Sequence, residues 1–306
     1  MVGENKKCKG AYDSAVTPWI RLVGVSGGKL EECVMSQEDI DKRNATFWNE
    51  LCGSGLAQAL GISDASPDSL RRFDEAFMGL YPYLDRYLLS AGVASKKVLE
   101  IGLGYGTLGQ ILASRGHDYY GLDIAAGPVD FMRYRLDLLG QNGKAKVQMG
   151  SALAIPYASA SFDYVYTIGC LHHTGNVSQA VSEVYRVLAP GGRAVVMLYN
   201  RLSFRRLIQV PWQRTRGLFI DDGRSFAERI RALYDTNTQG AAAPHTDYVS
   251  GLQARWLFRK FSHVRIDIHN FDSYSLRKGE FFLPREKFLN NVARVVGLDL
   301  YIRAQK

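Results

Sequence analysis

The chain has 306 residues, of which 46% are hydrophobic and 22% charged, and its formal net charge is +8. This length supports a substantial hydrophobic core, and we find no internal repeat or low-complexity tract. No apolar run approaches the roughly 20 residues that a transmembrane helix needs, and the polar start MVGENKKCKG predicts that no secretory signal is present.

The four cysteines, Cys8, Cys33, Cys52 and Cys170, are scattered along the chain and form no CxxC pair. Their spacing fits neither a zinc framework nor a disulfide scaffold. We therefore expect no metal site and a reducing, cytoplasmic compartment.

The first 92 residues are predicted to contain an arm and a helical cap. Residues 1–36 lack periodicity and are interpreted as an N-terminal arm, and residues 37–92 as the cap. Within the cap, residues 37–60 favour a helix broken at the glycines 53–55. A second helix is expected to begin at Ser66-Pro67-Asp68, because serine is a good N-cap and proline suits the first helical turn.

Residues 93–200 alternate between short apolar runs and helical patterns. This alternation indicates parallel strands joined by crossover helices, which is the doubly wound α/β architecture. The predicted strands are 97–103, 118–124, 145–150, 161–169 and 193–200, and the predicted helices are 106–116, 127–140 and 177–192.

The alternation lapses over residues 201–248, which are interpreted as a basic, partly helical insertion. Between residues 201 and 231 only Asp221, Asp222 and Glu228 oppose eight arginines. These arginines suit a solvated helical surface, an acidic ligand or a nucleic acid equally well. They are Arg201, Arg205, Arg206, Arg214, Arg216, Arg224, Arg229 and Arg231.

Residues 249–306 are predicted to complete the sheet. A helix over 250–261 precedes an alternating strand over 263–271 and a terminal apolar run over 297–304. Residues 273–297 between them are polar, and we expect a further, mainly helical insertion there.

A glycine-rich turn, LEIGLGYGTLG, follows the first predicted strand. Glycines at 102, 104 and 106 allow a tight turn and a close approach of the backbone to a ligand. Asp123, at the end of the next strand, is placed to bind the hydroxyls of an adenosine ribose, as in NAD or S-adenosylmethionine. Glu100 would repel a pyrophosphate but suits a ligand that carries an ammonium and a sulfonium.

Four blocks in this order resemble the successive motifs of class I S-adenosylmethionine-dependent methyltransferases. They are VLEIGLGYGTLG, YYGLDIA, GSALAIPYASASFDYVYTIGCLHHT and VYRVLAPGGRAVVMLYN. The similarity covers residues 96–200 and is strongest to the small-molecule type that includes ubiquinone- and menaquinone-pathway enzymes. It implies a Rossmann-like, seven-stranded methyltransferase sheet.

The resemblance also implies S-adenosylmethionine as cofactor and a set of binding residues. The glycines would line its methionine part, Glu100 its amino group, Asp123 the ribose and Ile124 the adenine. Ser151 stands where the family often has an aspartate for the adenine, so only the backbones of Ser151 and Ala152 are expected to serve there. The full set is Glu100, Gly102, Leu103, Gly104, Gly106, Asp123, Ile124, Ser151, Ala152, Gly169 and Cys170.

The passage IGCLHHTGN places a cysteine and two histidines after the strand 161–169. Ligands of open α/β sheets bind beyond the carboxyl ends of the strands, so this passage should border cofactor and acceptor. A metal site would need more ligands than are visible, and methyl transfer needs no cysteine nucleophile. His172 or His173 is a candidate general base or a structural cap, and His245 is a second candidate base.

Three aromatic residues of the cap, Trp48, Tyr81 and Tyr83, could either approach the sulfonium by a cation–π contact or pack as ordinary helix residues. The two insertions would form the acceptor pocket and a lid.

The sequence thus predicts a methyltransferase that methylates an O or N atom of a small molecule, with an acidic acceptor suggested by the arginines. The alternatives are an RNA or protein methyltransferase that uses residues 201–231, and a cofactor-binding protein without turnover. No NPPF/Y or DPPY motif of base-amino methyltransferases occurs. The oligomeric state is not predicted.

Overall fold

The computed structural model describes residues 35–51, 53–91, 93–215, 224–276 and 281–306. Of these, Ser36 to Lys306 belong to one structural unit. The predicted arm over residues 1–36 lies almost wholly outside the described residues.

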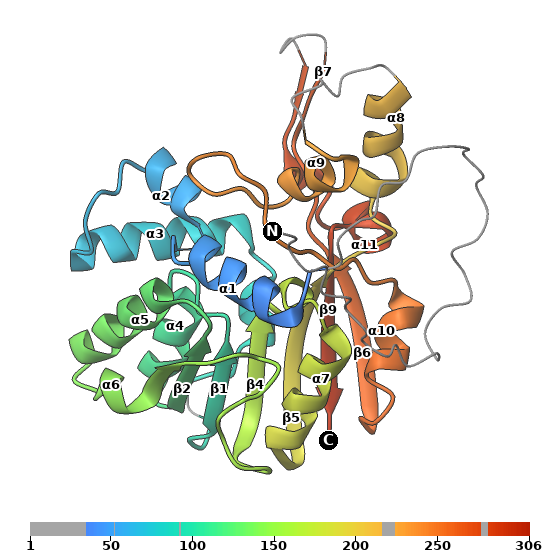
Figure 1. Cartoon of the computed structure of the whole chain (residues 1–306). Helices are drawn as coiled ribbons and strands as arrows, with labels where there is room; N and C mark the ends of the chain where they lie inside the picture. Colours follow the sequence, from blue (N-terminus) through green and yellow to red (C-terminus); the bar gives the residue numbers. More distant parts are fainter. Residues whose placement is uncertain (1–34, 52, 92, 216–223, 277–280) are drawn as a thin grey trace, which may run out of the picture. The chain divides into compact units, whose positions relative to one another are not determined.

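A seven-stranded sheet forms the centre of this unit, in the order β3-β2-β1-β4-β5-β9-β6 (Figure 1). Strand β9 runs antiparallel to both neighbours, and the remaining pairs are parallel. The predicted doubly wound sheet of seven strands is therefore confirmed. The strands are β1 Lys97–Ile101, β2 Asp118–Asp123, β3 Val147–Met149, β4 Phe162–Ile168, β5 Leu188–Tyr199, β6 His263–His269 and β9 Asp299–Gln305.

Helices pack on both faces of the central part of this sheet, which explains why strands such as β1 are apolar on both sides. On one face, α4 (Thr107–Ser114) and α5 (Ala126–Leu138) pack with Val98 of β1 in one core cluster. On the other face, α7 (Val177–Val187) packs with Leu99 of β1 in a second cluster. The second cluster also contains Ala254 of α10 (Gly251–Leu257), whereas the short α6 (Gly143–Lys146) precedes β3.

The cap consists of α1 (Gln37–Phe47), α2 (Ser54–Ala59), α3 (Pro67–Leu80) and a 3-10 turn, η1 (Leu84–Tyr87). The first predicted helix is broken earlier than expected, because α1 already ends at Phe47. The second begins as predicted: the Ser66 hydroxyl accepts from the Ser69 amide at 3.3 Å.

A buried ion pair joins the cap to the core. Asp74 of α3 accepts from both terminal nitrogens of Arg135 on α5, at 2.8 and 2.9 Å. The Thr107 hydroxyl donates to the same carboxylate at 2.7 Å. Because Thr107 begins α4, this contact also holds α3 against the glycine turn.

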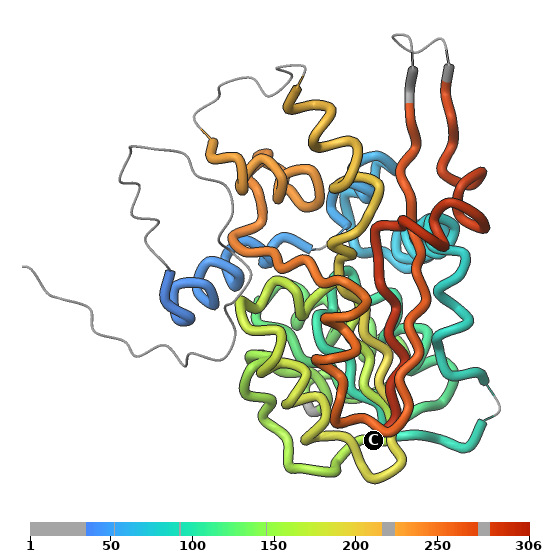
Figure 2. Tube along the Cα trace, turned by 90° about the vertical axis from the view of Figure 1, so that its right-hand side faces the viewer, coloured from blue at the N-terminus to red at the C-terminus, as the bar shows by residue number. Residues whose placement is uncertain are grey.

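The two insertions stand beyond the carboxyl ends of the strands (Figures 1 and 2). The first contains a π-helical turn η3 (Arg205–Gln209), α8 (Val210–Thr215) and α9 (Phe226–Ala232). The second was expected to be mainly helical, but it begins as an antiparallel hairpin of β7 (Tyr274–Leu276) and β8 (Phe281–Leu283), whose aromatic residues suit strands. It continues as a 3-10 turn, η5 (Arg285–Lys287), and α11 (Ala293–Val296). Among the described residues, no helix combines the length and apolarity needed to cross a membrane.

Candidate functional site

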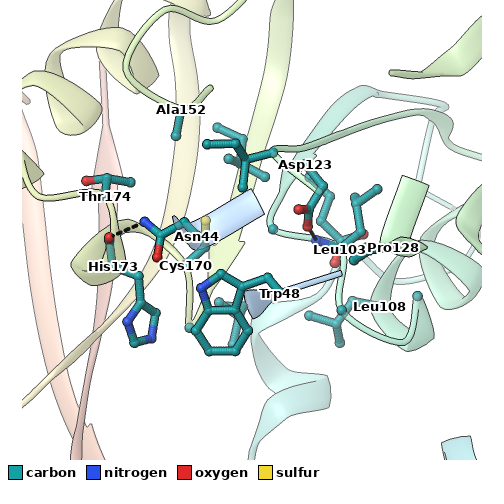
Figure 3. A pocket seen from close by; sticks show the side chains of 18 of the residues that line it. Asn44, Trp48, Leu103, Leu108, Asp123, Pro128, Ala152, Cys170, His173 and Thr174 are labelled. Carbon is teal, nitrogen blue, oxygen red and sulfur yellow. Dashed lines mark hydrogen bonds between the residues drawn. The ribbon is translucent and has the colours of Figure 1, made fainter. Parts of the chain in front are cut away.

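A pocket lies at the carboxyl ends of β1, β2 and β4 and is covered by α1 (Figure 3). This is the edge at which open α/β sheets bind ligands. All eleven residues that the sequence predicts for cofactor binding line this one pocket. They come from four separate segments. These segments meet because the strands are parallel, so the loops that follow them all begin at the same edge of the sheet.

The glycine turn requires glycine at Gly102 and Gly106 for two separate reasons. Both have positive φ angles, +82° and +78°, which side chains with a Cβ rarely adopt. A Cβ on Gly102 would also overlap Cys170, and one on Gly106 would lie 2.9 Å from Cδ of Arg135. The turn therefore passes close to the neighbouring loop and leaves its backbone exposed to the pocket.

Asp123 ends β2 and connects the glycine turn to this strand. Its two oxygens accept from the amides of Leu103 and Ala125, at 2.8 and 2.9 Å. Burial raises the pKa of Asp123 to about 6, although these amide donors oppose the rise. A carboxylate oxygen has more than one lone pair, so acceptor capacity remains for the two hydroxyls of a ribose.

Glu100 presents a second carboxyl group to the same pocket. It is 2% exposed, and the Tyr119 hydroxyl donates to it at 2.5 Å. Burial raises the pKa of Glu100 to about 8, with a smaller contribution from nearby Asp123. Such a buried carboxyl group is stabilised in its charged form by a cation, so the site fits a ligand ammonium.

Ser151, which replaces the family's usual aspartate, forms a local contact. Its hydroxyl oxygen accepts from the Leu153 amide at 3.2 Å and so supports the turn after β3. Its backbone and that of Ala152 line the pocket.

The cap contributes wall residues that the sequence did not single out. Asn44 of α1 is 4% exposed and donates to the His173 carbonyl at 2.7 Å, which orients its amide in Figure 3. Its Oδ1 has no hydrogen-bond partner among the described residues. An acceptor atom is thus available at the pocket, and only the packing of α1 on the loop after β4 reveals it.

The aromatic residues of the cap differ in whether they line the pocket. Trp48, for which both a place near the cofactor and ordinary helix packing were considered, lines the pocket, and its ring centre lies 4.8 Å from that of His173. Tyr81 and Tyr83 do not belong to the described wall, and Tyr83 instead stacks on His269 at 4.2 Å. Asp41, Phe77 and Tyr105 are wall residues that the sequence did not single out.

The three candidate histidines occupy different positions. His173 lines the pocket, whereas His172 and His245 are not among its described lining residues. His172 is completely buried against Tyr199, with ring centres 4.0 Å apart. His245 lies 3.2 Å from the Asp247 carboxylate. The sequence could not separate these histidines, because adjacent residues of a 3-10 turn point in different directions.

Both ring nitrogens of His173 face the protein. Nδ1 lies 2.7 Å from the His245 carbonyl, a distance that assigns the proton to Nδ1. Nε2 then lies 3.6 Å from the Asp235 carboxylate. Burial lowers the pKa of His173 and raises that of Asp235, and their mutual attraction opposes both shifts.

The described arginines of the arginine-rich segment do not line this pocket. None of its seven described arginines is a lining residue, and Arg216 lies outside the described residues. Arg205 pairs with Asp272, and the Arg231 Nε donates to the Ala243 carbonyl at 2.8 Å. Two of these arginines therefore stabilise the insertion itself. In the described part of the chain, no three His, Cys, Asp or Glu residues gather as metal ligands would.

Comparisons with known proteins agree with this geometry. Residues 99–196 match a family model described as a methyltransferase domain. The chain is 32% identical over 142 residues to the biotin biosynthesis bifunctional protein BioHC of Cellvibrio japonicus, covering 46% of this chain and 26% of that protein. It is 31% identical over 184 residues to the chloroplastic tocopherol O-methyltransferase of Arabidopsis thaliana, covering 55% and 51%.

The matched regions span between a quarter and about half of these curated relatives. Among solved structures, a chain from the complex of the Haloferax volcanii Trm112 methyltransferase activator with a methyltransferase superimposes with a TM-score of 0.52. It is 16% identical, and the match covers 78% of this chain and 94% of that one. This similarity supports the fold.

Proposed function

We propose that the chain, which belongs to the class I S-adenosylmethionine-dependent methyltransferases, transfers a methyl group from this cofactor to an O or N atom of a small molecule. The observation that carries the proposal is the gathering of Glu100, Asp123 and the glycine turn around one covered pocket. When bound, S-adenosylmethionine would supply a methyl carbon on a sulfonium: the acceptor lone pair would bond to this carbon as the C–S bond breaks, the neutral thioether would leave, and the methylated O or N atom would lose its proton.

The residues of the pocket fit the chemistry of this cofactor. Glu100 would hold the amino group, Asp123 the ribose hydroxyls, and the backbones of Ser151 and Ala152 the adenine. Trp48 lines the same pocket, and its aromatic ring suits a sulfonium. Most of the acceleration would come from alignment of the reacting atoms and from the exclusion of water by α1.

The wall supports a neutral or amine-bearing acceptor better than an acidic one. The part contributed by α1, its C-cap, α3 and the loop after β4 includes Asp41, Trp48, Phe77 and Thr174. The negative charge of Asp41 would repel an anionic acceptor, and none of the described lining residues offers a guanidinium. We therefore propose an acceptor with an apolar body and a hydroxyl or amine nucleophile.

His173 is proposed to position the wall and not to remove a proton. Its Nδ1 is engaged by the His245 carbonyl, and its Nε2 faces Asp235, which is not a lining residue. The ring supports Trp48, and the His173 carbonyl orients Asn44. A proton-removing role would require Nε2 to turn toward the acceptor.

Two measurements test the function. Calorimetry should detect S-adenosylmethionine binding that is lost in Asp123→Ala. An extract of small metabolites incubated with isotopically labelled methyl donor should yield a labelled product in its neutral or cationic fraction. Cofactor binding without any labelled product would instead support a protein without turnover, and label confined to the anionic fraction would refute the proposed acceptor class alone.

A further inference from the structure

A second concave site lies on the sheet face that faces away from α7 and α10. Cross-strand register places Tyr164, Arg193, Gln305 and His263 in one row across β4, β5, β9 and β6. Because side chains alternate along a strand, these residues point to the same face. The intervening residues, such as Ala194 and Ala304, belong to the core cluster beneath α7 and α10.

The next row of the same face holds Tyr166, Val195, Arg303 and Arg265. Residues 86–89, within and after η1, form a wall beside the two rows. The resulting groove has a volume of about 650 Å³, which lies in the range of small-molecule sites. It shares no lining residue with the pocket described above.

The charge of this groove has one sign. Four arginines, Arg86, Arg193, Arg265 and Arg303, line it together with His263, and none of the described lining residues is an aspartate or glutamate. Asp267, just outside the wall, accepts from Arg303 at 2.8 Å and from Arg265 at 3.3 Å. Arg86 and Arg193 form no ion pair with a residue that the structure describes.

Two of the arginines stand directly opposite each other. Arg265 of β6 and Arg303 of β9 are register partners in an antiparallel pair. Like charges in this arrangement destabilise a sheet, and both guanidiniums share the single carboxylate of Asp267 as their ion-pair partner. An anion bound between Arg193, Arg265 and Arg303 would remove this repulsion.

We propose that this groove binds a small polyanion that carries phosphate groups. Guanidinium groups bind phosphate oxygens in a bidentate manner, and the groove offers several of them around a floor of tyrosines. A second copy of the chain is a poor occupant, because an isologous contact across this face would bring arginines against arginines. The site is separate from the proposed methyl transfer and does not depend on it.

Titration with pyrophosphate at constant ionic strength tests the site. The wild-type protein should bind pyrophosphate in calorimetry, and the double variant Arg193→Gln/Arg265→Gln should bind it at least tenfold more weakly. Both arginines are exposed on the surface, so the fold should survive their loss. The matched control is Arg201→Gln/Arg255→Gln, which removes the same charge from two exposed positions outside the groove.

Three results would overturn the proposal. The first is that wild-type protein does not bind pyrophosphate at millimolar concentration. The second is an equal loss of affinity in both double variants, which would show a general effect of net charge. The third is displacement of pyrophosphate by S-adenosylmethionine, which would place it in the other pocket. Unchanged S-adenosylmethionine affinity in the groove variant confirms that the variant is folded.

Discussion

At the scale of single residues, Glu100 and Gly102 allow the sharpest tests of the pocket. Glu100 lies in β1 and Gly102 directly after it. Both have neighbours from other segments: Tyr119 of β2 beside Glu100, and Cys170 after β4 beside Gly102. Their behaviour therefore reports on the packed site and not on local sequence.

Glu100 should couple cofactor binding to proton release. Its pKa is raised to about 8 by burial, and a ligand ammonium beside it would lower that pKa. Below pH 8, binding should therefore release a proton from Glu100, and affinity should rise as pH increases from 6 to 8. Calorimetry in two buffers of different ionisation enthalpy measures the release, which should be smaller in Glu100→Gln.

The same shift has a consequence for the protein without ligand. The folded-state pKa of Glu100 lies above its ordinary value of 4.5, so the folded state binds the additional proton between pH 4.5 and 8. The free energy of unfolding should therefore fall as pH rises through this window. Urea titrations of Glu100→Gln should show a weaker fall, and identical slopes in the two proteins would contradict the assigned pKa.

Gly102→Ala should cost more stability than its backbone angle alone explains. Gly116 is a matched control, because its φ of +86° resembles the +82° of Gly102, but a Cβ there meets no atom within 4 Å. We expect Gly116→Ala to cost about 1–2 kcal/mol from the left-handed conformation. Gly102→Ala should cost clearly more in urea unfolding, because its Cβ also overlaps Cys170.

His173→Gln distinguishes the two roles of that residue. If the ring positions the wall, turnover should fall less than tenfold, and KM for the acceptor should rise. Loss of a general base would instead lower kcat by about 10²–10⁴-fold with cofactor affinity intact.

At the scale of elements, an ion pair between Asp74 and the buried Arg135 helps to hold α3 against the core. Arg135 is 1% exposed and has Asp74 as its carboxylate partner, with the Thr107 hydroxyl on the same carboxylate. Since α3 also supplies Phe73, which stacks on Tyr105 at 3.9 Å, this contact holds the cap over the glycine turn.

Asp74→Ala should destabilise the protein by about 3 kcal/mol, because it leaves a buried guanidinium without its carboxylate. Cofactor affinity should fall as well, since α3 would no longer hold the turn. Asp68→Ala on the same helix is the control: its pair with Arg71 is exposed, so little change is expected. Equal midpoints of urea unfolding for the two variants would contradict this account.

Local residue patterns were sufficient to predict some of the helices and strands but not others. Helices α4, α5 and α7 and the strands between them lie close to their predicted ranges, because their apolar periodicity reflects burial on a regular sheet. The first helix of the cap ends at Phe47, a few residues before the break predicted at the glycines 53–55, and α2 begins at Ser54. The insertion 273–297 was expected to be mainly helical, but it begins as a hairpin. The backbone hydrogen bonds between two paired strands stabilise this hairpin, and the residue pattern of either strand alone does not indicate the pairing.

At the scale of the whole molecule, two separate sites lie on one sheet, one at the carboxyl ends of its strands and one on its face. The pocket lies where loops leave the carboxyl ends of β1, β2 and β4, and the arginine groove lies on an exposed part of the face of β5, β9 and β6. Because the two sites share no lining residue, one protein molecule should bind both ligands at the same time.

The sequence by itself determined the doubly wound sheet and the similarity of its core to methyltransferases, and it singled out the eleven residues proposed for the cofactor. It could do so because Glu100, the glycines and Asp123 lie in short motifs at the ends of consecutive strands. The tertiary structure alone decided that Asn44 and Asp41 reach the pocket, that His173 lines it and His172 does not, and that Arg265 stands opposite Arg303. These relations depend on helix packing and strand register between distant segments, which no local pattern of residues encodes.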